Sequence, residues 1–113
     1  MTNPWYKLIQ LILEGEGYHV LVAGNATEAL QAVQHSKPDL ILMDIHLPSL
    51  DGLALTKLLR SDQESRHIKI VAISAYASAE DDKRISDAGC AGFIPKPIDS
   101  RTLAASIRGY LDK

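Results

Sequence analysis

The chain of 113 residues contains one cysteine, one tryptophan and one phenylalanine, and it has no large excess of charge of either sign. A single cysteine, Cys90, cannot form an internal disulfide or assemble a zinc site, which favours a reducing, cytoplasmic location. The formal net charge of −2 argues against a general nucleic-acid binder, because such proteins are normally basic. No apolar run approaches the roughly 18 residues of a membrane span, and the N-terminus does not resemble a signal peptide. We therefore expect neither nucleic acid nor membrane among its partners.

The sequence does contain a regular alternation of helix and strand patterns. Its length suits a single domain over residues 1–113, and its 46% apolar residues are enough for one core. Five helical patterns alternate with four β-prone runs, which lie at residues 18–23, 39–44, 69–74 and 92–95. Asn3 is the expected cap of the first helix, and Asp99 or Ser100 that of the last. This order predicts an α/β fold with a parallel sheet and helices on both faces.

Three polar residues stand at the ends of three successive predicted strands. Asp44 and Ser74 end the two fully apolar strands, and Lys96 follows the short strand at residues 92–95. In open parallel sheets ligands bind outside the C-terminal strand ends, so these side chains should meet at one edge. A carboxylate can attack phosphorus, while a hydroxyl and an ammonium stabilise charge on phosphoryl oxygens. Each residue alone is more often a turn former or a solvated side chain, but the three together indicate phosphoryl chemistry.

The segments around these residues resemble response-regulator receiver domains of two-component signalling systems. The matching segments are residues 40–52, 70–75 and 88–97. The resemblance implies a flavodoxin-like receiver fold, in which Asp44 accepts a phosphoryl group from a histidine kinase or phosphotransfer protein. It further implies that Ser74 bonds the phosphoryl group, that Lys96 is the lysine of the family's site, and that output passes to a downstream protein partner. A receiver is a signalling module and not an enzyme.

The start of the chain departs from the family pattern. Receivers normally open with an apolar strand that ends in an acidic pair, whereas here only two residues precede Asn3. In the family that pair holds Mg²⁺, and what remains by resemblance is the carboxylate of Asp44 and the backbone carbonyl of His46. Mg²⁺ prefers more than one carboxylate in addition to its waters. We therefore expect weak or absent Mg²⁺ binding and slow or absent phosphorylation.

The absent strand is central in the family, between the runs at residues 18–23 and 39–44. Removing it leaves a gap of two strand spacings, about 9–10 Å, with unpaired backbone on each side. Unpaired buried backbone is costly, so either residues 18–23 move inward to pair or another chain supplies the pairing. Both outcomes favour self-association, and we expect a homodimer with a rearranged N-terminal helix and strand. A misassigned start or a shortened chain would produce the same sequence.

Three functional interpretations follow from these observations. The first is a phosphorylatable receiver that relays a signal by protein contact, with impaired phosphorylation. The second is a degenerate receiver that acts as a binding or dimerisation module without phosphorylation. The third is a phosphohydrolase with an aspartate nucleophile, which is remote because Asp44-Ile-His46 lacks the second acid of that class.

Overall fold

A three-stranded parallel sheet forms the centre of the molecule. The computed structural model describes residues 4–23, 25–44, 52–74, 79–95 and 98–112. The strands are β1 (Leu40–Asp44), β2 (Lys69–Ser74) and β3 (Gly92–Pro95), in the spatial order β1-β2-β3. Both neighbouring pairs are parallel, with Asp44 opposite Ile73 and Ser74 opposite Pro95. The predicted parallel α/β sheet is therefore confirmed.

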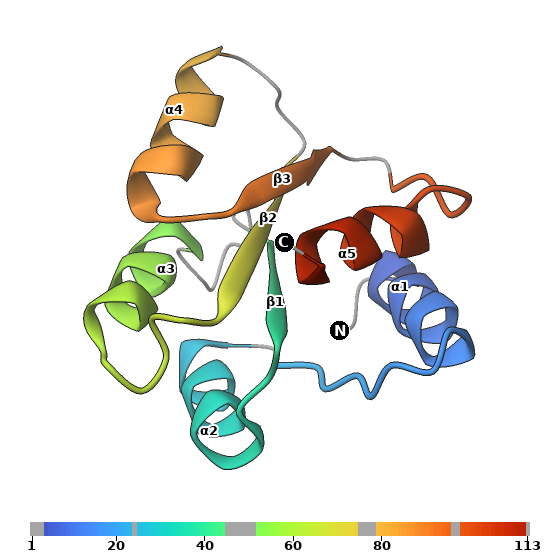
Figure 1. Cartoon of the computed structure of the whole chain (residues 1–113), viewed down its shortest axis with the longest axis horizontal. Coiled ribbons are helices and arrows are strands. Elements are labelled where there is room, and N and C mark those ends of the chain that lie inside the picture. The colour runs from blue at the N-terminus through green and yellow to red at the C-terminus, as the bar shows by residue number, and fades with distance from the viewer. Residues whose placement is uncertain (1–3, 24, 45–51, 75–78, 96–97, 113) are drawn as a thin grey trace.

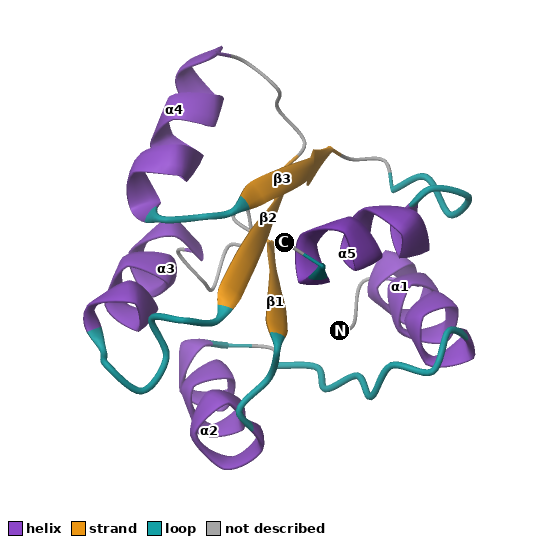
Figure 2. Cartoon of the chain, viewed as in Figure 1, coloured by secondary structure: helices purple, strands orange, loops and turns teal. Residues whose placement is uncertain are grey.

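Five helices cover the two faces of this sheet (Figures 1 and 2). They are α1 (Pro4–Gly15), α2 (Ala26–Ser36), α3 (Gly52–Ser61), α4 (Ala79–Ala88) and α5 (Leu103–Leu111). Helices α1 and α5 pack against each other on one side, while α2 and α3 lie on the other and α4 packs on α3. Helices on both faces explain why β2 is buried along nearly its whole length and reads as an unbroken apolar run.

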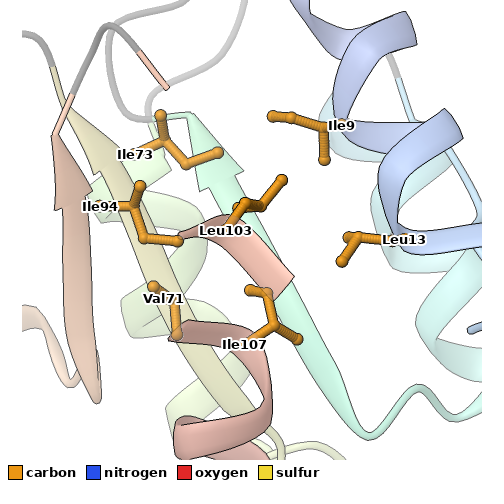
Figure 3. Close-up of a cluster of buried hydrophobic side chains, with 7 residues drawn as sticks. All are labelled: Ile9, Leu13, Val71, Ile73, Ile94, Leu103 and Ile107. Atoms are coloured by element: carbon orange, nitrogen blue, oxygen red, sulfur yellow. The ribbon is translucent and has the colours of Figure 1, made fainter. Parts of the chain in front are cut away.

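One buried cluster joins α1 and α5 to the sheet (Figure 3). Its members are Ile9, Leu13, Val71, Ile73, Ile94, Leu103 and Ile107, each no more than 8% exposed. In α1 the two members are four residues apart, as they are in α5, so each helix presents one apolar face. At the edge of this layer, Lys69 Nζ donates to the carbonyl of Tyr110 at 2.5 Å, which places a cation at the C-terminal end of α5.

A second buried cluster occupies the opposite face, between the sheet, α2 and α3. Met43, Leu55, Leu59 and Ile70 form its core, and half-buried apolar residues of α2 pack against it. Helix α2 begins at a regular cap, since the Asn25 side chain accepts a hydrogen bond from the Glu28 N–H at 2.9 Å. It ends before Lys37, whose φ of 45° stops the helix ahead of Pro38.

The predicted strand at residues 18–23 does not form. This segment is an irregular connection between α1 and α2, and Leu21 and Val22 in it are 50% and 58% exposed. A β-prone run becomes a strand only when a neighbouring strand pairs with it, and in the described part of the chain β1 pairs with β2 alone. The prediction that residues 18–23 move inward and pair with β1 is therefore wrong for this structure.

The helix caps predicted at the two ends have different outcomes. Helix α5 begins at Leu103, after a turn closed by the Asp99 carbonyl, with Thr102 at the N-cap, so capping by Asp99 or Ser100 is wrong. The Asp99 carboxylate instead accepts from the Arg101 N–H at 2.9 Å. Asn3, the predicted cap of α1, lies outside the described residues.

Candidate functional site

Asp44 and Ser74 lie on neighbouring strands at the same end of the sheet. Asp44 is the last residue of β1 and stands opposite Ile73, so Ser74 is one residue further along the next strand. Neighbouring strands are roughly 4.8 Å apart, which puts the two residues within one strand spacing across the sheet. The parallel topology predicted from the sequence thus brings these two site residues together.

Both residues are buried although both are polar. Asp44 is 5% exposed and Ser74 is 1% exposed. Burial of a carboxylate costs free energy unless it is hydrogen-bonded or paired, so a buried acid at a strand end is seldom an accident of turn formation. No described buried side-chain nitrogen or oxygen lacks a hydrogen-bond partner, so these groups stand in a satisfied polar environment. A carboxylate beside a hydroxyl at the open end of a parallel sheet is suited to binding or accepting a phosphoryl group.

Two further predicted site residues cannot be placed. Lys96 directly follows β3, whose last residue, Pro95, stands opposite Ser74. Lys96 and His46 both lie outside the described residues, so their predicted roles stay predictions. Three other histidines, His19, His35 and His67, are all exposed.

The described residues do not make a metal site. Within residues 4–23, 25–44, 52–74, 79–95 and 98–112 there is no group of three or more His, Cys, Asp or Glu side chains that could hold an ion. The donor set that Mg²⁺ prefers is one or two carboxylates with waters in octahedral geometry, and Asp44 supplies one. Among the described residues, the donor set therefore falls short of the one that Mg²⁺ prefers.

The sequence profile of the response regulator receiver domain matches residues 4–108. The chain belongs to the response-regulator receiver family. Members of this family are in general signalling modules that interact with histidine kinases and downstream partners, and they typically use Mg²⁺ at the phosphorylation site.

Curated receiver relatives cover most of the chain. A polar-differentiation response regulator, DivK, of Brucella anthropi is 42% identical over 105 residues, which are 93% of this chain and 85% of the relative. The DivK protein of Brucella ovis is 41% identical over 105 residues, which again are 93% of this chain and 85% of the relative.

Solved receiver structures share the fold. A putative response regulator from Chloroflexus aurantiacus superposes with a TM-score of 0.88 at 27% identity, covering 96% of this chain and 88% of that one. A CheY-like receiver domain protein from Methanospirillum hungatei gives 0.83 at 32% identity, covering 95% and 84%. This receiver therefore has the family's flavodoxin-like arrangement, although its sheet has three strands in the described residues.

Arg60 is a residue whose position the sequence did not reveal. Its Nε donates to the carbonyl of Gly89 at 2.8 Å, and its guanidinium also bonds the carbonyl of Arg66. Gly89 has φ of +104°, and a Cβ there would meet the Arg60 side chain, so this receiver needs glycine at the turn before β3. Because 29 residues separate the partners, no local pattern could have signalled the contact.

No described helix of this receiver is long and apolar enough to cross a membrane.

Proposed function

We propose that this receiver accepts a phosphoryl group on Asp44 from a histidine kinase or phosphotransfer protein and passes the signal on by protein contact. The observation that carries the proposal is that two buried polar residues, Asp44 and Ser74, lie on neighbouring strands at the C-terminal end of one parallel sheet. In this proposal residues 1–113 form one cytoplasmic receiver domain, which takes neither nucleic acid nor membrane as partner and is not itself an enzyme.

In the transfer, a carboxylate oxygen of Asp44 attacks the phosphorus of a phosphohistidine. A P–O bond forms as the P–N bond breaks, and the imidazole nitrogen leaves with the electron pair. The Ser74 hydroxyl donates to a phosphoryl oxygen, and the Lys96 ammonium compensates the added negative charge. The family's Mg²⁺ would supply further charge neutralisation when bound.

We further propose that these 113 residues bind Mg²⁺ weakly, through Asp44 and the carbonyl of His46, and are phosphorylated slowly. Support comes from the described donor set, in which Asp44 belongs to no group of three metal-ligating side chains. The second candidate function, a binding module that works without phosphorylation, is favoured by the same observation.

Incubation with acetyl phosphate, with and without Mg²⁺, tests these proposals when followed by intact mass. We expect the slow gain of one phosphoryl group, its loss in Asp44→Asn, and at most a weak dependence on Mg²⁺. Ser74→Ala should slow the gain without abolishing it, because serine stabilises charge and is not the acceptor. No gain over hours would favour the phosphorylation-independent module, and a gain that persists in Asp44→Asn would exclude Asp44 as the acceptor.

We also propose that the receiver forms a homodimer through α1. Leu8 and Leu11 are 43% and 58% exposed although they belong to an otherwise core-facing helix. Residues three apart in a helix are neighbours on its surface, so the two leucines form one apolar strip. Apolar strips of this kind are typical of protein contacts.

A further inference from the structure

A groove of about 280 Å³ lies between α3 and α4, which pack against each other (Figure 1). From α3 it is lined by Leu53, Ala54 and Lys57, and from α4 by Arg84 and Asp87. Residues three or four apart in a helix share one face, so each helix presents one such face to the groove. The two placed residues of the phosphoryl site do not line it, so the groove is a separate surface.

The charge of this groove has the opposite sign to that of the whole chain. Lys57, Arg84 and Asp87 are all exposed, and these two cations and one acid give the groove a positive charge, whereas the chain carries −2. No ion pair between described residues engages any of the three. Within the described part of the chain the two cations thus have no fixed counter-ion, and a carboxylate that enters the groove would meet both.

We propose that this groove binds a glutamate side chain from an acidic segment of a partner polypeptide. The guanidinium of Arg84 can hold a carboxylate by two parallel hydrogen bonds, and the Lys57 ammonium adds a second positive charge. Leu53 is half-buried and Ala54 is exposed, so the groove also offers apolar surface to the methylene groups of the glutamate. The inference takes from the proposed function only that this receiver signals by protein contact, and it requires no phosphoryl group on Asp44.

Other ligands fit the groove less well. A nucleic acid needs a row of cations for its phosphates, and a chain of net charge −2 repels them outside the groove. Inorganic phosphate would meet the two cations but would leave Leu53 and Ala54 uncovered. A divalent cation would find Asp87 as the one acid among the described lining residues, beside two positive charges. An acidic peptide is repelled by the chain as a whole and attracted here, and such complementarity selects a binding surface.

The test uses a synthetic peptide that repeats glutamate, alanine and leucine, and a control peptide with glutamine in place of every glutamate. Titration calorimetry with the unphosphorylated 113-residue chain at low salt should give binding that is about tenfold weaker for the control. Added salt should weaken binding of the acidic peptide and hardly change that of the control, because ions screen charges. Nuclear magnetic resonance of the same mixture should show the largest amide shifts in residues 53–57 and 84–87.

Matched protein variants locate the binding. Lys57→Gln and Arg84→Gln should each weaken it about fivefold, because each removes one of the two cations of the groove. The control Lys83→Gln removes the same charge from an exposed neighbour on α4 that does not line the groove, and it should leave binding unchanged. Asp87→Asn should tighten binding about threefold, because it removes a like charge beside the bound carboxylate. All four side chains are exposed, so the fold should not change.

The outcomes separate this inference from its alternatives and from phosphotransfer. It is overturned if the acidic peptide does not bind, if the glutamine peptide binds equally, or if Lys83→Gln weakens binding as much as Arg84→Gln. Inorganic phosphate that displaces the peptide at equal concentration would assign the groove to small anions and would also overturn it. No phosphodonor is present in the titration, so its failure would leave the role of Asp44 untouched, and absent phosphorylation of Asp44 would leave the groove untouched.

Discussion

At the scale of single residues, Asp44 combines a cost to folding with an expected gain in function. Asp44 is 5% exposed, in a sheet whose other buried residues are mostly apolar. Functional sites commonly retain such groups at the expense of stability. Asp44→Asn keeps the shape of the side chain and removes the buried charge, so we expect the free energy of unfolding to rise by about 1 kcal/mol. Urea unfolding of both proteins at pH 7 measures the change.

The comparison variant for Asp44 is Thr56→Val. Thr56 is fully buried, and its Oγ1 donates to the Gly52 carbonyl at 2.8 Å within α3, which is a purely structural contact. This variant should lower stability by about 1 kcal/mol, because a buried hydrogen bond is lost. A similar loss in Asp44→Asn would show that Asp44 serves the fold and would count against its role as a phosphoacceptor.

Cys90 gives a pH prediction at the same scale. Burial raises the pKa of its thiol above the ordinary value of 9.0, and this outweighs the opposite effects of the Thr56 hydrogen bond and the Arg60 charge. The native chain thus holds this proton to higher pH than the unfolded chain, so the thiol's contribution to stability is lost as pH rises above about 9. Reaction with a disulfide reagent should be slower in the native chain than in urea from pH 8 to 10. Equal pH–rate curves in the two states would contradict the raised pKa.

At the residue scale, part of the candidate site could be read from the sequence. Asp44 and Ser74 were expected to lie close together because each ends an apolar run. The strand register places them on neighbouring strands at the same end of the sheet. The proximity of Arg60 to Cys90 could not be foreseen, since no basic residue adjoins Cys90 in the sequence. A contact across 30 residues depends on how α3 and the turn before β3 pack, and no local pattern encodes it.

At the scale of elements, local sequence patterns correctly predicted the three strands that pair with each other. They failed for residues 18–23, which the patterns predicted to be a strand. The bounds of β2 and β3 agree with the predicted runs at residues 69–74 and 92–95, because those segments have the strand partners that their patterns require. Residues 18–23 have equally strong β propensity but adopt no strand, because pairing is a tertiary property. The cap of α5 was predicted too early in the chain, because the Asp99 carboxylate closes a turn before the helix and does not cap the helix itself.

Replacement by alanine should have opposite effects on stability at two glycines, Gly92 in β3 and Gly109 in α5. A Cβ on Gly92 in β3 would lie 2.7 Å from ring carbons of Tyr110, whereas a Cβ on Gly109 in α5 would meet nothing within 4 Å. Gly92→Ala should therefore destabilise the receiver by about 1–3 kcal/mol through overpacking. Gly109→Ala should stabilise it by about 0.5–1 kcal/mol, because alanine loses less entropy in a helix.

Thermal unfolding of both glycine variants, and of Gly92→Ala combined with Tyr110→Ala, measures these effects. Gly92→Ala should cost little stability when residue 110 is already alanine, because the collision needs both groups. The double variant should therefore be nearly as stable as Tyr110→Ala alone. An equal loss in both backgrounds would mean that Gly92 is required for backbone reasons and not for close packing.

At the scale of the whole molecule, five helices cover the two faces of a sheet that has three strands in the described residues. The helices and the sheet enclose two buried clusters, and a cavity of about 450 Å³ beside β1 is lined by residues of both helical layers. The sequence predicted such a gap through the family resemblance, and the structure corrects how it is bordered, by an irregular segment in place of a strand. The surface proposed for contact with a second copy is the strip of Leu8 and Leu11 on α1.

The proposed dimer through the strip on α1 gives the last prediction. Leu8→Glu with Leu11→Glu places two charges on the exposed face of α1 and should convert the proposed dimer to a monomer. The charge-matched control is Leu58→Glu with Ser61→Glu on the exposed surface of α3, which should leave the dimer intact. Light scattering after size exclusion measures the mass, and the melting temperature of the unaltered chain should rise with protein concentration. A chain that stays monomeric at high concentration, or a dimer that persists in the α1 variant, would contradict dimerisation through this helix.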